Sequence, residues 1–160
     1  MDDKGVIMEK KKIIIYYAHP KTHYDTNLEY ECLEFLHTTF GAYSEFPDMD
    51  IEIFNPNEPI ISKLYQNRKD NNHPDRFEIF REFARASDIL VMTSFLDGYL
   101  GSGVAEEGDQ ALCAEKKVFL LSFVDLDGYT VKCLQLIKNF DGLKLLSYEE
   151  TVERINNGVQ

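Results

Sequence analysis

The chain contains 160 residues, of which 44% are hydrophobic, and it carries a formal net charge of −11 at pH 7. This length suits one domain with a sizeable core, and the hydrophobic content excludes disorder for most of the chain. The negative charge argues against a nucleic-acid polymer or an anionic membrane surface as partner, because both are bound through clustered Lys and Arg side chains.

Several features predict a single cytoplasmic domain. Residues 1–11 are expected to form a polar, disordered leader, and residues 12–160 the domain itself. The longest apolar runs, Ile13–Ile15 and Val118–Leu121, are far shorter than a membrane span, so no membrane partner is expected. The three cysteines are widely spaced, which favours free thiols in the reducing cytoplasm over disulfides.

The first half of the chain begins with a strand pattern. Lys12–Ala18 is continuously apolar and β-branched, which is typical of a central parallel strand. Thr26–Glu29 matches a capping box and predicts a helix ending near Phe40. The alternation in Asp50–Phe54 predicts a second strand nearer an edge, and residues 55–72 predict a long polar loop.

The next segment contains the most informative pattern. Pro74 suits the first turn of a helix that ends near Ala86, and Asp88–Phe95 predicts the third strand. A glycine-rich loop, Gly101–Gly103, then leads into a helix that ends near Glu115.

The last segment completes the predicted alternation. Lys117–Val124 predicts a fourth strand, Tyr129–Asn139 a helix and Leu143–Leu146 a short fifth strand, while Ser147–Glu150 is a capping box that begins a C-terminal helix. This order predicts an α/β fold: a flavodoxin-like, doubly wound sheet of five parallel strands with helices on both faces.

Two glutamates follow the glycine loop at an edge where parallel sheets bind ligands. Helical spacing turns one stripe of the helix toward the sheet, formed by Val104, Gly108, Ala111, Leu112 and Glu115. Glu107 lies on or beside this inward stripe, and Glu106 lies on its flank. Acidic residues in a first helical turn are commonly only partners of the helix dipole. The position beneath a glycine loop favours a function, and Glu107 is the candidate.

The other candidates also have ordinary interpretations. Asp88 reads as a turn residue before the third strand, and Asp97 as part of an Asp-Gly turn after it. Tyr16 fits core packing, although its hydroxyl could reach a site at the strand end. His19 follows the first strand and could contact a ligand.

No metal or cofactor is expected. The spacing of His and Cys matches no zinc pattern. Gly101, Ser102 and Gly103 lack the further glycine of a dinucleotide motif and the Gly-Lys-Ser/Thr of a phosphate loop.

The sequence resembles the nucleoside 2-deoxyribosyltransferase family, together with its relatives that hydrolyse the N-glycosidic bond of deoxynucleoside 5′-monophosphates. The matching pieces are Ile15–Ala18, Ala86–Ile89, Gly103–Glu107 with Ala111, and Lys116–Val118. The resemblance implies a small-molecule nucleoside or nucleotide partner and a homo-oligomer.

Residue by residue, the resemblance implies that Glu107 is the catalytic glutamate, Tyr16 the tyrosine of the first strand and Asp88 the aspartate near the leaving base. His19, Asp97 and the 101–103 loop would then contact substrate. Glu107 would attack C1′ and form a covalent glycosyl-enzyme, which a second base (transfer) or water (hydrolysis) resolves.

The match to the family departs in three places. Gly108 stands one residue earlier than the family's glycine, which leaves a competing register through Glu106. Gly101 stands where the transferases carry an aspartate, and Ser102 is one position from the phosphate-binding serine of the hydrolases. The helix start at Ser102 and Gly103 still offers a place for a 5′-phosphate. Transfer and hydrolysis therefore both stay open.

Two alternatives without catalysis also fit this fold class. One is a nucleotide- or nucleotide-sugar-binding module, in which the acidic loop binds a ribose without cleaving it. The other is a protein-interaction scaffold, in which Asp88 is only a turn residue and Glu107 only a dipole partner.

Overall fold

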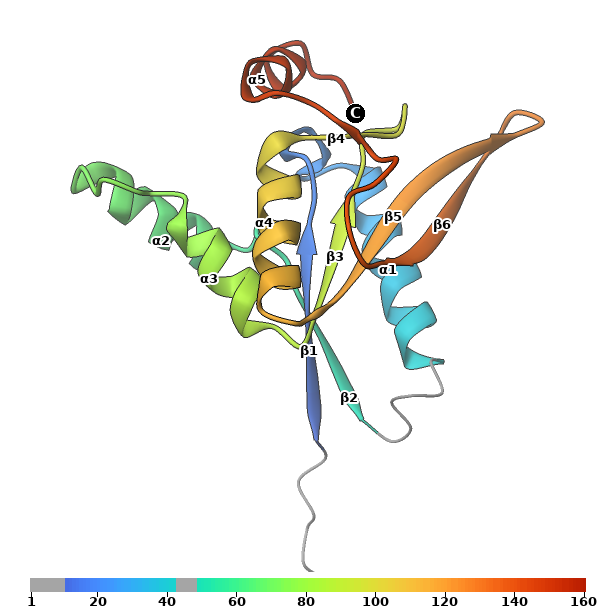
Figure 1. Cartoon of the computed structure of the whole chain (residues 1–160), viewed down its shortest axis with the longest axis horizontal. Coiled ribbons are helices and arrows are strands. Elements are labelled where there is room, and N and C mark those ends of the chain that lie inside the picture. Colours follow the sequence, from blue (N-terminus) through green and yellow to red (C-terminus); the bar gives the residue numbers. More distant parts are fainter. Residues whose placement is uncertain (1–10, 43–48) are drawn as a thin grey trace, which may run out of the picture.

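A computed structural model describes residues 11–42 and 49–160, so most of the expected leader, residues 1–10, lies outside the described residues. The centre is a five-stranded sheet in the order β2-β1-β3-β5-β6 (Figure 1). Its strands are β1 (Lys12–Ala18), β2 (Asp50–Phe54), β3 (Ile89–Thr93), β5 (Lys117–Leu126) and β6 (Tyr129–Ile137). The contacts β1–β2, β1–β3 and β3–β5 are parallel, and β5–β6 is antiparallel. A second, two-stranded parallel sheet joins β4 (Tyr99–Leu100) to β7 (Lys144–Leu145).

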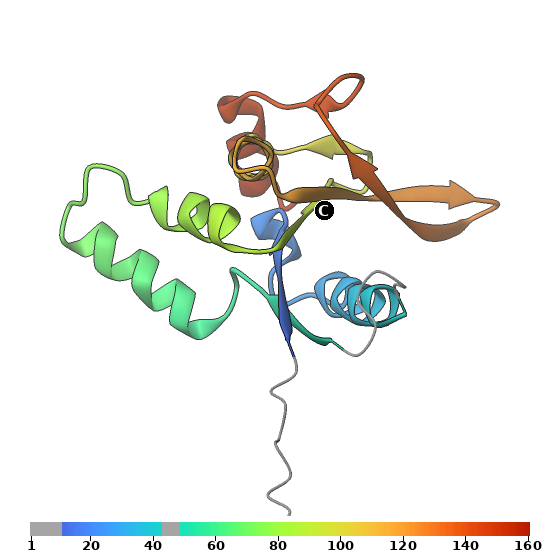
Figure 2. The same cartoon turned by 60° about the horizontal axis from the view of Figure 1, so that its bottom comes forward.

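Helices lie on both faces of the main sheet (Figures 1 and 2). They are η1 (Lys21–His23, a 3-10 turn), α1 (Asn27–Gly41), α2 (Pro59–Asp70), α3 (Glu78–Ala86), α4 (Ser102–Cys113) and α5 (Tyr148–Asn156). Leu36 of α1 packs with Tyr17 in the core on one face, whereas α4 packs with Tyr16 in the core on the other. Successive residues of a strand point to opposite faces, which separates these two tyrosines.

The predicted helix starts of α1 and α5 are confirmed by their caps. The Thr26 hydroxyl accepts a hydrogen bond from the Glu29 N–H at 3.2 Å. At α5, the Glu150 N–H donates to Ser147 Oγ, and the Glu150 carboxylate accepts from the Ser147 N–H. These reciprocal bonds satisfy donors that a helix start would otherwise leave open.

The predicted helix over Tyr129–Asn139 is wrong, because these residues form strand β6. Asp127 and Gly128 both have positive φ, at 53° and 85°, and Leu126 pairs with Tyr129 across them. A two-residue Asp-Gly turn of this kind matches the twist of a hairpin. The fifth strand of the main sheet is therefore antiparallel, so the expectation of five parallel strands is also wrong. The segment predicted as the fifth strand supplies β7 of the small sheet.

The predicted loop over residues 55–72 is wrong over most of its length, because Pro59–Asp70 forms α2. Pro59 occupies the first helical turn, where its missing N–H is of no consequence. The following helix, α3, begins at Glu78 and not at Pro74. Together α2 and α3 form an extension that projects beyond the sheet (Figures 1 and 2).

Over the two described ranges, no helix combines the length and the apolar character needed to cross a membrane.

Candidate functional site

The strand order places the most favourable ligand position at the carboxyl ends of β1 and β3. The chain leaves β1 toward α1 on one face and leaves β3 toward α4 on the other. Ligands of open α/β sheets bind where neighbouring strands send their helices to opposite faces, outside the carboxyl ends of the strands. The segments at this position are the turn around Lys21–His23 and the chain from Ser94 to Gly101.

Helix α4 approaches β3 closely through Gly108. A Cβ atom on Gly108 would lie 2.1 Å from Met92 Sδ and 3.2 Å from Phe140 Cζ. Met92 is fully buried and has little room to move. The predicted inward stripe is confirmed for Val104, Gly108 and Ala111, which are buried, while Leu112 is half-buried. It is wrong for Glu115, which lies beyond the end of α4 and is exposed.

This close approach brings the Glu107 carboxyl toward the hydroxyl of Tyr16, which is fully buried. Burial raises the pKa of Glu107 to about 8, with the Glu106 charge adding to the effect and the Tyr16 hydroxyl opposing it. Burial and the nearby Glu107 charge together hold the pKa of Tyr16 well above its usual range. The Tyr16 hydroxyl makes no hydrogen bond of ordinary geometry within residues 11–42 and 49–160. It is therefore a donor and acceptor that a ligand or water can engage.

Tyr24 is a third member of this group that the sequence did not reveal. It is half-buried and follows the 3-10 turn after β1. Burial raises its pKa, and the charges of Glu107 and Glu29 raise it further. Its phenol is thus protonated and close to Glu107. The only available signal was an aromatic residue in an otherwise polar loop beyond the first strand.

His19 belongs to a separate hydrogen-bonded pair. Its Nδ1 lies 3.0 Å from the Tyr17 carbonyl oxygen, and its Nε2 lies 3.0 Å from Glu29 Oε1. Both ring nitrogens thus have a hydrogen-bond partner within the protein. The His19 ring also lies 4.9 Å from that of Tyr24. His19 therefore uses its polar atoms inside the protein and packs against a residue of the site.

Glu29 is held as a carboxylate by several donors. It accepts from the Asp25 N–H at 2.7 Å, from Asn55 at 2.9 Å and from Asn57 at 3.1 Å. Burial by itself would raise the pKa of Glu29, but the bonds from His19, Asn55 and the Asp25 N–H outweigh it and lower the pKa to about 2. The result is a carboxylate whose hydrogen bonds fix the turn after β1 to α1.

Further polar groups without partners gather near the carboxyl ends of β1 and β3. Besides Tyr16 Oη, the buried atoms with no hydrogen-bond partner in the described part of the chain are Tyr17 Oη, Thr22 Oγ1, His23 Nδ1, His23 Nε2, Thr93 Oγ1 and Ser94 Oγ. Burial, together with the charge of His19, lowers the pKa of His23 to about 4, so this ring is neutral at pH 7. Buried polar groups normally find a partner, so this cluster marks a place for water or ligand atoms.

Asp88 does not join Glu107 and Tyr16. It precedes β3, at the opposite end of the strand from the glycine loop. Its carboxylate accepts a hydrogen bond from the Ile14 N–H at 2.9 Å, and its own N–H donates to the Ile14 carbonyl at 2.9 Å. The structure thus gives Asp88 a part in joining β1 to β3.

The remaining predicted site residues contact α5. Asp97 pairs with Arg154 at 2.7 Å, and the Ser102 N–H donates to Thr151 Oγ1 at 2.9 Å. Gly101 is the buried N-cap of α4, whereas Gly103 is exposed with open space around it. The start of α4 is therefore partly covered by the C-terminal helix.

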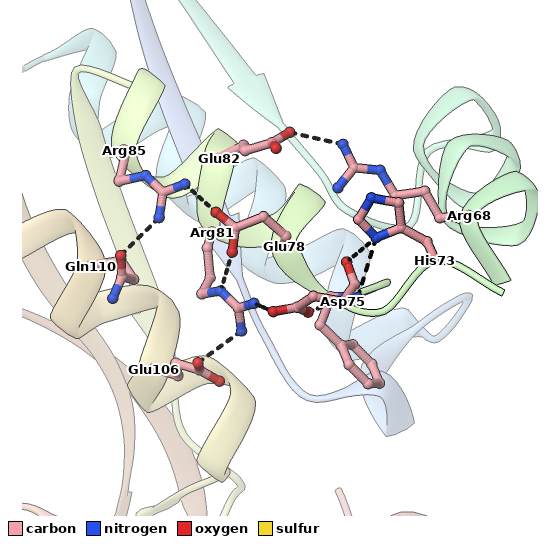
Figure 3. Close-up of polar contacts among 10 residues, drawn as sticks. Arg68, His73, Asp75, Glu78, Arg81, Glu82, Arg85, Glu106 and Gln110 are labelled. Atoms are coloured by element: carbon pink, nitrogen blue, oxygen red, sulfur yellow. Dashed lines mark hydrogen bonds and ion pairs between the residues drawn. The ribbon is translucent and has the colours of Figure 1, made fainter.

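Glu106 belongs to an ion-pair network between α3 and α4 (Figure 3). Arg81 donates to Glu106 at 2.8 Å and to Glu78 at 2.7 Å, and it also pairs with Asp75. Its neighbour Arg85 bonds Gln110 at 2.8 Å and also pairs with Glu78. The structure thus separates the two glutamates by environment, with Glu106 at the surface and Glu107 turned inward.

Among the described residues, no three His, Cys, Asp or Glu side chains come together in a group that could hold a metal ion. No protein-family model and no curated protein matches the chain.

Proposed function

We propose that this protein cleaves the N-glycosidic bond of a nucleoside or nucleoside 5′-monophosphate, by transfer to a second base or by hydrolysis. The observation that carries the proposal is the inward carboxyl of Glu107, which lies near the hydroxyls of Tyr16 and Tyr24 at the ligand-binding end of the sheet. The resemblance of the sequence to the nucleoside 2-deoxyribosyltransferase family supports the same reaction.

In the proposed reaction the Glu107 carboxylate attacks C1′ as the C1′–N bond breaks. The electron pair of that bond leaves with the base, which takes a proton from solvent or from a hydroxyl in the site. A second base or water then displaces Glu107 from C1′. A carboxylate that is shielded from water stabilises the positive charge that develops at C1′ far more strongly than a carboxylate in water does.

The surroundings of Glu107 make the proposed reaction dependent on pH. At a pKa of about 8 the free protein holds Glu107 mostly protonated at neutral pH. The attacking form is the carboxylate, so kcat/KM should rise with pH and level off above about 8. Tyr16 and Tyr24 stay protonated throughout and can donate hydrogen bonds to Glu107 or to sugar oxygens.

Asp88 has no part in this proposal, because its carboxylate is bonded to the Ile14 backbone at the far end of β3. Tyr16 and Tyr24 take its place as the groups that assist Glu107. We also propose that the fold is a flavodoxin-like, doubly wound domain in which the antiparallel strand β6 is the one departure from that arrangement. The proposed assembly is a homo-oligomer, and the proposed location is the cytoplasm.

The test is to follow base release from deoxynucleosides and from their 5′-monophosphates, with and without an acceptor base. Glu107→Gln should abolish release, whereas the matched Glu106→Gln, which alters the neighbouring surface carboxylate, should retain it. A 2′-fluoro nucleoside should leave a sugar adduct on Glu107, detectable by mass spectrometry of the digested protein. Equal turnover by the Glu107→Gln variant would refute the mechanism. Ligand binding with no base release from any substrate would favour a non-catalytic binding module.

A further inference from the structure

We propose that α5 is a lid over the carboxyl ends of β1 and β3, and that it must move away before a substrate can reach Glu107. The inference rests on the proposed function and describes how the site of that reaction opens. Its evidence is that the polar groups of the site are enclosed and that α5 is the most weakly anchored helix beside them.

The polar groups at this end of the sheet are closed off from solvent. Tyr16, His23 and Ser94 are fully buried, yet their hydroxyls and ring nitrogens have no hydrogen-bond partner in the described part of the chain. Native proteins seldom leave so many buried polar atoms unpaired. The Tyr16 hydroxyl lies beside Glu107. A nucleoside that reaches Glu107 meets this hydroxyl, which solvent does not reach in this conformation, so a covering segment has to move.

The turn after β1 is firmly held, whereas α5 is not. The Glu29 carboxylate accepts hydrogen bonds from the Asp25 N–H and from Asn57, and Asn57 also donates to the Asp25 carboxylate. Helix α5 differs, because it is the one α-helix within residues 11–42 and 49–160 that has no buried residue. Segments with few buried contacts open locally at a low cost in free energy.

Arg154 joins α5 to the loop after β3. Its Nη1 donates to both carboxylate oxygens of Asp97, at 2.9 and 2.7 Å. Its guanidinium carbon lies 5.2 Å from the centre of the Phe95 ring and 4.9 Å from that of the Tyr99 ring. The Asp97 side chain is 49% exposed, and ion pairs this exposed are weak and are screened by salt. Arg154 can therefore hold α5 closed and still release it.

Phe95 connects α5 to the enclosed groups. Its ring is fully buried, and the ring centre lies 6.4 Å from that of His23. Figure 1 shows α5 beyond the start of α4, at the end toward which β1 and β3 point. The Ser102 N–H donates to Thr151 Oγ1 there at 2.9 Å. Movement of α5 would take Arg154 off the Phe95 ring and uncover this side of the cluster.

A disulfide between α5 and the residue before α4 would lock the lid. A Cβ on Gly101 would lie 3.2 Å from Thr151 Cγ2. This is close to the ~3 Å that separates a Cβ atom from the far sulfur of a disulfide. Gly101 has an ordinary φ of −66°, so it accepts a side chain without backbone strain. The test variant is Gly101→Cys with Thr151→Cys, in a background of Cys113→Ser and Cys133→Ser that removes the exposed thiols.

The first measurement compares base release from a deoxynucleoside by the oxidised and the reduced forms of this one protein, so the substitutions are the same on both sides. Mass spectrometry of the digested protein verifies the disulfide. The oxidised form should lose at least about tenfold in kcat/KM, and a reductant should restore it. Equal release by the two forms would overturn the lid and leave the proposed function standing. If the reduced form is inactive while the unmodified protein is active, the second measurement decides.

The second measurement is hydrogen exchange of the backbone amides, which needs no activity. In the unmodified protein the amides of α5 and of Ser102 should exchange faster than those of β3, because the lid opens without global unfolding. Arg154→Gln should speed this exchange by about two- to fivefold. Arg76→Gln is the matched control, since Arg76 is exposed and lies 5.1 Å from the Phe77 ring centre, and it should not change the exchange.

The exchange experiment also separates the lid from the reaction. Exchange of the Ser102 amide at the rate of the β3 amides, unchanged by Arg154→Gln, would overturn the lid. Absence of base release from every substrate, with the Ser102 amide exchanging faster in Arg154→Gln, would refute the proposed function and retain α5 as a lid over the enclosed polar groups.

Discussion

His19 Nε2 lies 3.0 Å from Glu29 Oε1, and this buried hydrogen-bonded pair joins the end of β1 to α1. Removing one partner of a buried hydrogen-bonded pair leaves polar atoms of the other without a partner, which commonly destabilises a fold by about 1–3 kcal/mol. Glu29→Gln should produce a loss of this order in urea unfolding at neutral pH. Glu31→Gln is the matched control on the same helix. Its exposed pair with Lys132 is expected to contribute less than about 1 kcal/mol.

The hydrogen bonds of Glu29 should also make the stability of the protein depend on pH in the acidic range. The pKa of Glu29 is about 2 in the folded protein against an ordinary 4.5, so the folded state binds fewer protons between these values. Its contribution to the free energy of unfolding is therefore complete above about pH 4.5 and is lost as the pH falls toward 2. The difference in unfolding free energy between the unmodified protein and Glu29→Gln should shrink across this window. A constant difference would show that Glu29 is not held as a carboxylate.

Glu107 should show the opposite dependence, because its folded pKa is raised. Between an ordinary 4.5 and about 8 the folded protein binds more protons than the unfolded chain, so this group lowers the stability as the pH rises through that range. Glu107→Gln replaces the protonated acid with a neutral group of similar shape. It should stabilise the protein at about pH 9 more than at about pH 6, as measured by denaturant unfolding. Glu106→Gln should show no such gain. If the stabilisation by Glu107→Gln does not change with pH, the Glu107 carboxyl does not have a raised pKa in the folded protein.

Gly108 should tolerate no side chain. Gly108→Ala would place a Cβ 2.1 Å from the sulfur of fully buried Met92, so α4 must shift away from β3. Overpacking of this kind commonly costs about 1–3 kcal/mol. Gly103→Ala, in the same helix but in open space, should instead leave the stability unchanged or raise it by up to ~1 kcal/mol. Equal denaturation midpoints for the two variants would show that the close approach is not needed.

Sequence patterns predicted structural features that are set by residues close together in the chain, such as helix caps and the inward face of a helix. The caps at Thr26 and Ser147 and the inward stripe of α4 follow from spacing alone, and the structure confirms them except at Glu115, where the helix has already ended. The pattern of Tyr129–Asn139 fits a helix as well as a strand, and the Asp127–Gly128 turn before it is the local feature that favours the hairpin. Tyr24 and Thr151 could not be found from spacing, because their contacts with α4 join segments that are distant in the chain. Asp88 received a role near Glu107 from the resemblance alone, whereas the pattern that places it before β3 already puts it at the opposite end of the strand from the glycine loop.

Substitutions of Asp88 test whether this residue has the catalytic role that the resemblance implies or the structural role that its hydrogen bond indicates. Its carboxylate accepts from the Ile14 N–H at 2.9 Å, so its expected contribution is to strand pairing. Asp88→Asn keeps an oxygen acceptor and should retain both stability and base release. Asp88→Ala leaves the Ile14 N–H without this partner and should lower the free energy of unfolding by about 1 kcal/mol. Loss of base release in Asp88→Asn at unchanged stability would return Asp88 to the catalytic group, because a purely structural residue cannot reduce turnover while its hydrogen bond is preserved.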